Sequence, residues 1–273
     1  MSWRMGSCRR ATRALVFERT PVFAGEAGLL AQRGQQGQQV PASPRAIAPK
    51  DFTGYWVSVV TEDWRWRMVG PAKGDYDSVP LNAEGRRVAN TWDPTRDETA
   101  GESCRAYAAP AIMRVPGRLH VTWDNDTTLR LDTEAGTQTR LLRFAPTARA
   151  PTDDNQAARS ESTWQGQSLA QWELSGRSGM FGGPPPGPSG ALKVVTTHIR
   201  PGYLRRNGVP FSANAVLTEY FNVLGPDDQG DVWIVVTTIV QDPQYLTGRF
   251  LTSTHFKKLS DGSSWHPTPC RAL

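Results

Sequence analysis

Short runs of apolar residues, many of them alternating with polar ones, recur along most of the chain. Residues 119–123 alternate Leu, Val and Trp with His and Thr, and residues 232–240 are nearly all β-branched. Alternation with period two is typical of strands that bury one face, and a β-branched run is typical of a barrel wall or of a strand buried on both faces. Other strands are predicted at residues 52–60, 63–68, 129–131, 138–144, 164–174, 191–199, 211–223 and 250–258.

The segments between these runs are short, which favours antiparallel pairing of consecutive strands. Residues 124–126 and 135–136 are predicted turns. Residues 81–92 are the best helix candidate, because three of their apolar side chains can share one face and Pro94 follows. We therefore expect one mainly β domain of roughly nine or ten strands with one or two short helices. Its architecture would be an antiparallel barrel, similar to lipocalins, or a sandwich.

The charge is concentrated at the N-terminus. The formal net charge is +5, but residues 1–50 hold eight basic and two acidic side chains, which leaves 23 basic and 24 acidic groups in residues 51–273. A domain so close to neutral lacks the field that concentrates polyanions, so we do not expect it to bind nucleic acid.

We interpret residues 1–50 as a basic leader with a degenerate export signal and a flexible linker, followed by a single domain over 51–273. Residues 179–190 hold four prolines and are predicted to form a Gly/Pro loop. No segment of the sequence is long and apolar enough to span a bilayer.

Three cysteines suggest one disulfide. Cys8 lies in the leader, which leaves Cys104 and Cys270 as a natural pair. A bridge across a loop of that length stabilises by about 4–5 kcal/mol in the chain-entropy model. It would persist only in an oxidising compartment, which predicts a periplasmic or secreted protein. The alternative is two unrelated buried thiols.

A series of short motifs follows the chain in order: Gly54-Tyr55-Trp56, residues 104–113, Pro116-Gly117, and residues 164–173, 192–197, 207–210, 217–221 and 238–245. With this series the chain resembles a group of uncharacterised exported proteins of environmental bacteria, over about residues 51–270. The resemblance implies export and a β-rich fold, but no activity. Gly54-Tyr55-Trp56 is also similar to the Gly-x-Trp of lipocalin-type barrels, whose tryptophan closes one barrel end.

Two basic and aromatic clusters are candidate binding sites. On a strand, Trp64 and Trp66 would share one face, and Arg65 and Arg67 the other. The arginines could bind a carboxylate or phosphate bidentately inside a barrel cavity, or the tryptophans could line a pocket for an apolar or sugar ligand. The alternative is that the tryptophans are core and the arginines face water. The second cluster, which could equally be an exposed loop, contains Arg200, Tyr203, Arg205 and Arg206.

Candidates for catalysis are weaker. Glu173, Glu219 and Asp242 lie on or near predicted strands and could act as paired carboxylates in glycoside hydrolysis, although solvent-facing salt bridges are commoner. Ser168 lacks the final glycine of a nucleophile elbow. The spacing of His120, His198, His255 and His266 matches no metal motif, so we expect neither a metal nor another cofactor.

We expect an exported, non-enzymatic barrel that binds a small ligand or an envelope component. A cavity of several hundred Å³ lined by Trp64 or Arg65 would favour this hypothesis. The alternatives are a periplasmic hydrolase, favoured by two carboxylates roughly 5–10 Å apart, and an interaction module without a pocket, favoured by a solid apolar interior.

Overall fold

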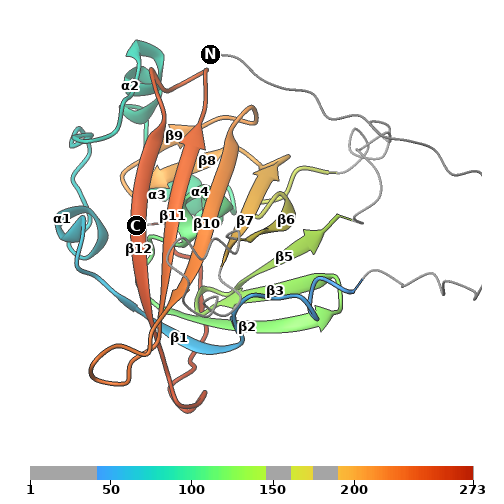
Figure 1. The fold of residues 1–273 in the computed structure, drawn as a ribbon. Helices are drawn as coiled ribbons and strands as arrows, with labels where there is room; N and C mark the ends of the chain where they lie inside the picture. The colour runs from blue at the N-terminus through green and yellow to red at the C-terminus, as the bar shows by residue number, and fades with distance from the viewer. Residues whose placement is uncertain (1–41, 146–160, 175–189, 273) are drawn as a thin grey trace, which may run out of the picture. The chain divides into compact units, whose positions relative to one another are not determined.

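The computed structural model describes residues 42–145, 161–174 and 190–272. Within these ranges nine strands close into a barrel (Figure 1). They are β1 (Gly54–Val59), β2 (Arg118–Asn125), β3 (Thr128–Thr133), β5 (Gln138–Phe144), β6 (Gln167–Leu174), β7 (Gly190–Thr197), β10 (Val216–Leu224), β11 (Trp233–Gln241) and β12 (Phe250–Lys258).

The order around the barrel is β1, β12, β11, β10, β7, β6, β5, β3, β2. Neighbours pair antiparallel except β5 and β6, which are parallel. The predicted mainly β barrel is confirmed, and the sandwich alternative is excluded. Lipocalin-type up-and-down barrels have eight antiparallel strands, so this barrel differs from them in strand number and in its parallel pair.

Short elements accompany the barrel, mostly between β1 and β2 and between β7 and β10. The helices are α1 (Trp64–Arg67), α2 (Ala83–Ala89), α3 (Pro94–Thr99), the 3-10 helix η1 (Ser103–Tyr107) and α4 (Ala109–Ile112). The remaining strands form two small sheets, β8 (Gly202–Arg205) with β9 (Val209–Phe211), and β4 (Ala135–Gly136) with β13 (Thr268–Pro269).

One predicted strand is wrong. Residues 63–68 form the helical turn α1, in which the Arg67 and Met68 amides donate to the carbonyls of Asp63 and Trp64. The chain leaves the barrel after Val59, and Asp63 adopts a positive φ of 52° that starts the helical turn, so this segment does not continue β1 along the edge of β12. The predicted division into a tryptophan face in the core and an arginine face in water is also wrong, because Trp64 is 60% exposed whereas the Arg67 side chain is buried.

The other expectations for single elements are largely confirmed. The β-branched run at residues 232–240 forms β11. Buried and less buried side chains alternate along this strand, as in a barrel wall, so it is not buried on both faces. The predicted helix became α2, but it ends at Ala89, and Pro94 begins α3. The leader and nearly all of the predicted Gly/Pro loop lie outside the described residues.

The barrel interior is filled in layers. At one end a large apolar cluster includes Trp56, Leu142 and Phe221. A polar layer follows on the same inward faces, and a second apolar cluster that includes Leu217 and Phe250 lies beyond it. The polar layer consists of buried Arg140, Ser168, Thr196, Glu219, Thr238, Thr252 and Thr254. Buried side chains therefore fill the described part of the interior with two apolar clusters and a polar layer between them.

The two barrel ends are closed differently. At one end Phe52 stacks on Trp172, whose Nε1 donates to the carbonyl of Pro44 at 2.8 Å. Residues 42–50, which the sequence analysis assigned to the linker, thus contact the barrel. At the other end lie the helices and the β8–β9 hairpin (Figure 1). That second end carries the candidate sites.

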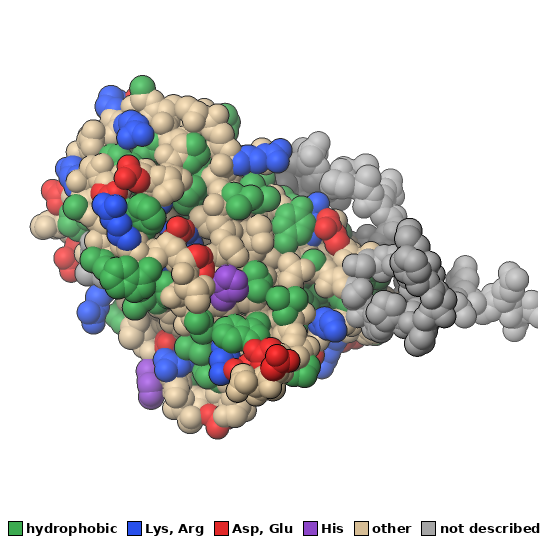
Figure 2. Space-filling model, turned by 60° about the vertical axis from the view of Figure 1, so that its left-hand side comes forward, with side chains coloured by type: hydrophobic (Ala, Val, Ile, Leu, Met, Phe, Trp, Pro, Cys, Tyr) green, Lys and Arg blue, Asp and Glu red, His purple; other side chains and the backbone are tan. Residues whose placement is uncertain are grey.

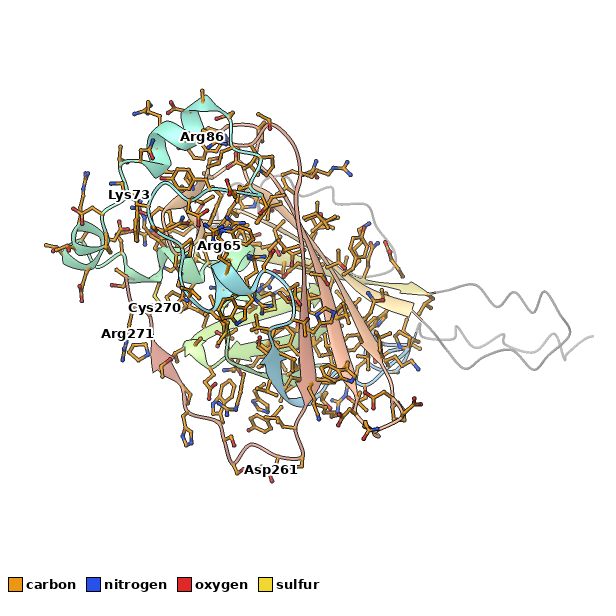
Figure 3. The ribbon with its side chains drawn as sticks, turned by 90° about the vertical axis from the view of Figure 1, so that its left-hand side faces the viewer. Arg65, Lys73, Arg86, Asp261, Cys270 and Arg271 are labelled. Atoms are coloured by element: carbon orange, nitrogen blue, oxygen red, sulfur yellow. A yellow bond between two sulfur atoms is a disulfide. The ribbon has the colours of Figure 1, made fainter. Side chains whose placement is uncertain are left out.

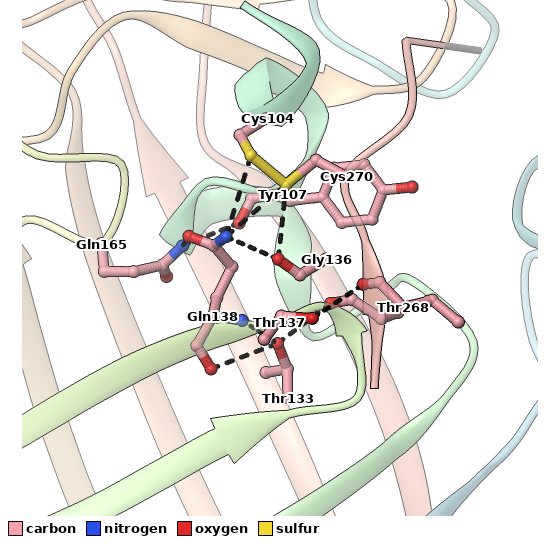
Figure 4. Close-up of a disulfide and its surroundings, with 10 residues drawn as sticks. Cys104, Tyr107, Thr133, Gly136, Thr137, Gln138, Gln165, Thr268 and Cys270 are labelled. Carbon is pink, nitrogen blue, oxygen red and sulfur yellow. Dashed lines mark hydrogen bonds between the residues drawn. A yellow bond between two sulfur atoms is a disulfide. The ribbon is translucent and has the colours of Figure 1, made fainter. Parts of the chain in front are cut away.

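The disulfide between Cys104 and Cys270 is present, as predicted (Figure 4). It joins η1 to the C-terminal segment next to the barrel rim. Gln138 of β5 donates to the carbonyl of Gly136 at 2.7 Å, and its side-chain oxygen accepts from Gln165 at 3.1 Å. Gln165, just before β6, also donates to the carbonyl of Tyr107 at 2.8 Å, so these bonds link η1 to β5 and to the start of the β6 segment.

Candidate functional site

The main candidate is a pocket that has a volume of about 470 Å³ and lies between α2, α3 and the β8–β9 hairpin; we call it the large pocket, to distinguish it from a smaller one lined by arginines. This volume lies in the range typical of small-molecule sites. Its walls include the aromatic rings of Trp92, Tyr203, Phe211 and Tyr245. Polar groups interrupt the aromatic lining, and the most prominent are Asp93, Arg96, Asp97, Glu102 and Arg105. A wider and more open hollow of about 650 Å³ lies at the ends of β6, β7 and β10, and no aromatic side chain among the described residues lines it.

Local sequence signals build the pocket wall. The carboxylate of Asp93 accepts from the amides of Thr95 and Arg96, which caps α3 and fixes where it begins. The β8–β9 turn contains Gly208 at φ +82°, packed against the Trp92 ring so closely that any side chain there would clash. This glycine lets the hairpin approach the segment between α2 and α3.

A hydrogen-bonded network forms the polar part of the pocket. The Tyr203 hydroxyl donates to Asp97 at 2.7 Å, and Arg105 donates to the other oxygen of Asp97 at 2.8 Å. Burial, together with the bond to Asp97, raises the pKa of Tyr203. Although burial opposes it, the interactions with Tyr203, Asp97 and Glu102 raise the pKa of Arg105. The network is therefore a neutral phenol held between a carboxylate and a guanidinium.

The structure brings together some residues of the two basic and aromatic clusters that the sequence predicted. The guanidinium of Arg205 lies 4.7 Å from the ring centroid of Trp66, and Arg206 donates to the carbonyl of Arg67 at 3.2 Å. These residues come from segments about 140 positions apart in the sequence. We call Arg67, Arg114, Arg205 and Arg206 the arginine cluster; together they line a second, smaller pocket.

The other predicted binding residues lie elsewhere. Trp64 and Arg65 are exposed, and Arg65 pairs with Asp75 at 2.8 Å. Arg200 pairs with Glu102 and stacks 4.4 Å over Trp164. Tyr203 is the only one of the seven predicted binding residues that lines the large pocket. Neither Trp64 nor Arg65 lines either of the two pockets described above.

The three candidate catalytic acids have separate structural partners. Both oxygens of Glu219 accept from Arg140, at 3.0 and 2.5 Å, inside the barrel. Buried Asp242 accepts from the amide and hydroxyl of Ser212. Glu173 forms a partly exposed ion pair with Lys193 at 3.1 Å. None of the three lines the large pocket, but Glu173 lines the open hollow at the ends of β6, β7 and β10.

Metal ligands are not assembled in the part of the chain that the structure describes, where no group of three or more His, Cys, Asp or Glu could hold an ion. His255 pairs with Glu62 at 2.9 Å, and His120 stacks on Tyr55 at 4.1 Å.

Among the helices of residues 42–145, 161–174 and 190–272, none is long and apolar enough to cross a bilayer.

Sequence reasoning missed most of the large pocket. Asp93 followed by Pro94 is a recognisable helix start, and it marks the wall that carries Asp97. Nothing local to Arg105 or Arg114 predicts where they lie, because both positions depend on η1 and α4 packing against β8.

Acidic and basic side chains are interspersed over one face of the molecule, as Figure 2 shows, in keeping with a nearly neutral domain.

Comparison of the chain with protein-family models, with curated proteins and with solved structures found no match.

Proposed function

We propose that this chain is an exported binding protein that holds a small polar ligand with an apolar face, of the sugar class, in the large pocket. The observation that carries the proposal is the combination of aromatic walls with the Tyr203–Asp97–Arg105 network. Aromatic rings cover the apolar face of such a ligand, and a few fixed polar groups orient it. The polar groups in the lining make a purely apolar ligand less suitable.

Export is supported by the disulfide between Cys104 and Cys270. Such bridges persist in oxidising compartments and are rare where thiols are kept reduced. The resemblance to exported proteins points the same way. Mass spectrometry of the protein from its native cell should find the two residues joined, whereas two alkylatable thiols without reductant would contradict export.

Binding can be tested by saturation-transfer NMR with a panel of monosaccharides. Ala100 lines the pocket at the end of α3, so Ala100→Trp should fill the space and abolish the signal. Ala83, also an exposed helix-end alanine but not part of the lining, supplies the matched control Ala83→Trp, which should retain binding. Absence of binding by the unmodified protein, or equal binding by Ala100→Trp, would refute the proposal.

A further inference from the structure

The arginine cluster brings four guanidinium groups together around one small pocket. Arg67 pairs with Glu62, and Arg114 pairs with Asp63 at 2.6 Å. Arg205 forms no ion pair with a described residue, and its Nη1 donates to the backbone carbonyl of Asp77 at 2.7 Å. Three of these side chains are deeply buried, at 2% exposure for Arg67, 5% for Arg114 and 4% for Arg205.

Several guanidinium N–H groups in the cluster have no acceptor. Nε and Nη2 of Arg205 and Nη2 of Arg114 are buried without a hydrogen-bond partner among the described residues. Buried polar groups are nearly always hydrogen-bonded, so three unpaired donors around one pocket indicate a missing acceptor. Because each N–H belongs to a cation, the acceptor that fits best is an anion.

The surroundings strengthen an attraction to an anion. The guanidiniums of Arg114 and Arg205 lie 5.7 and 5.8 Å from the ring centroid of Phe250, and Trp66 covers Arg205 from another side. Aromatic walls exclude water and lower the local dielectric, which strengthens charge interactions. Burial, followed by the nearby charge of Arg114, lowers the pKa of Arg205 to about 10, although the carboxylates of Asp63, Asp75 and Asp77 act in the opposite direction.

The size of the pocket limits the kind of anion. Its volume is about 20 Å³, which is room for one or two atoms the size of a water oxygen. A planar carboxylate with two oxygens suits so narrow a space better than the tetrahedral phosphate or sulfate, of which a smaller part could enter. Arginine forks also match carboxylate geometry.

We infer that the arginine cluster is a binding site for a carboxylate group, independent of the large pocket. Nη2 of Arg114 and both Nε and Nη2 of Arg205 would donate to the carboxylate oxygens. Half-buried Arg206 would add positive charge at the edge of the site. The rest of a larger carboxylic acid would lie outside the pocket.

The test is the thermal unfolding of the full chain in low millimolar sodium acetate, at constant ionic strength set with sodium sulfate. A saturable rise in Tm with acetate is expected, and no such rise with phosphate. Arg205→Met should lose the acetate response while unfolding, without acetate, at the same temperature as the unmodified protein or higher, because it removes an unpaired buried charge. Arg205→Gln is the second variant, because it keeps a donor, and it should also lose the response.

The matched control is Arg86→Met on α2, an exposed arginine toward the same end of the barrel (Figure 3). It should keep the full acetate response. No response in the unmodified protein, or an equal response in Arg205→Gln, would overturn the inference. An equal rise with chloride would overturn the carboxylate assignment in favour of a halide site. Failure of monosaccharides to bind would leave this result unaffected, since that test uses a different pocket.

Discussion

At the scale of single residues, the two charged side chains of the polar layer, Arg140 and Glu219, are each other's structural partners. Arg140 and Glu219 are both fully buried and bond to each other through two hydrogen bonds. Buried pairs contribute little net stability compared with apolar replacements, but breaking one leaves a buried charge without a partner. Glu219 is therefore better explained as the partner of Arg140 than as a catalytic acid.

Glu219→Gln should lower the free energy of unfolding by about 3–5 kcal/mol, because Arg140 would stay buried without its counter-charge. The matched control is Glu173→Gln, since Glu173 forms a partly exposed pair with Lys193; we expect a loss below about 1 kcal/mol. Urea unfolding measures both. The double variant Arg140→Met with Glu219→Leu should recover most of the loss, and similar losses in the two single variants would contradict this explanation.

At the scale of elements, the β8–β9 hairpin connects the two candidate sites. Tyr203 lines the large pocket, while Arg205 and Arg206 belong to the arginine cluster and line the smaller pocket. The tight turn at Gly208 sets how closely the hairpin approaches Trp92. The geometry of the large pocket therefore depends on one position that only glycine fills without strain.

Gly208→Ala should destabilise the protein by about 2–4 kcal/mol, through the cost of a positive φ and the clash with Trp92. Gly230 offers the matched control, because it has a similar φ of +80° in another hairpin turn but open space around it. Gly230→Ala should cost only the backbone part, about 1–2 kcal/mol. Guanidinium unfolding measures the difference, and equal losses would show that contact with Trp92 is unimportant.

At the scale of the whole molecule, the disulfide ties the C-terminal segment to the helices that cover one barrel end. Cys104 and Cys270 are separated by 166 positions in the sequence. Cross-linking so long a loop restricts the unfolded chain and so stabilises the folded one. The bridge should therefore matter for the stability of the whole domain.

The double variant Cys104→Ser with Cys270→Ser should lose about 2–5 kcal/mol of stability, measured as a lower Tm. Reductant should lower the Tm of the unmodified protein by a similar amount and leave that of the variant unchanged, which is the control. An unchanged Tm after reduction, with both thiols shown to be free by mass spectrometry, would contradict a stabilising role.

The sequence by itself determined the barrel strands and the disulfide pair. Strands such as β11 and β12 appear in the sequence because alternation and β-branching reflect a backbone with one buried face. We predicted Glu219 as a catalytic acid or a solvent-facing salt bridge, although its inward direction could have been read from Leu217 and Phe221, two positions on either side of it. Leu142, two positions after Arg140, gives the same signal for Arg140.

Tertiary structure decided the rest. The alternation of residues 63–68 predicted a strand, but the chain leaves the barrel after Val59, and this segment forms α1 with Arg67 buried. Both sites depend on contacts between distant segments, such as Arg105 with Tyr203 and Arg205 with Trp66. Local sequence encodes backbone preference and burial, whereas the meeting of such residues depends on how the barrel closes.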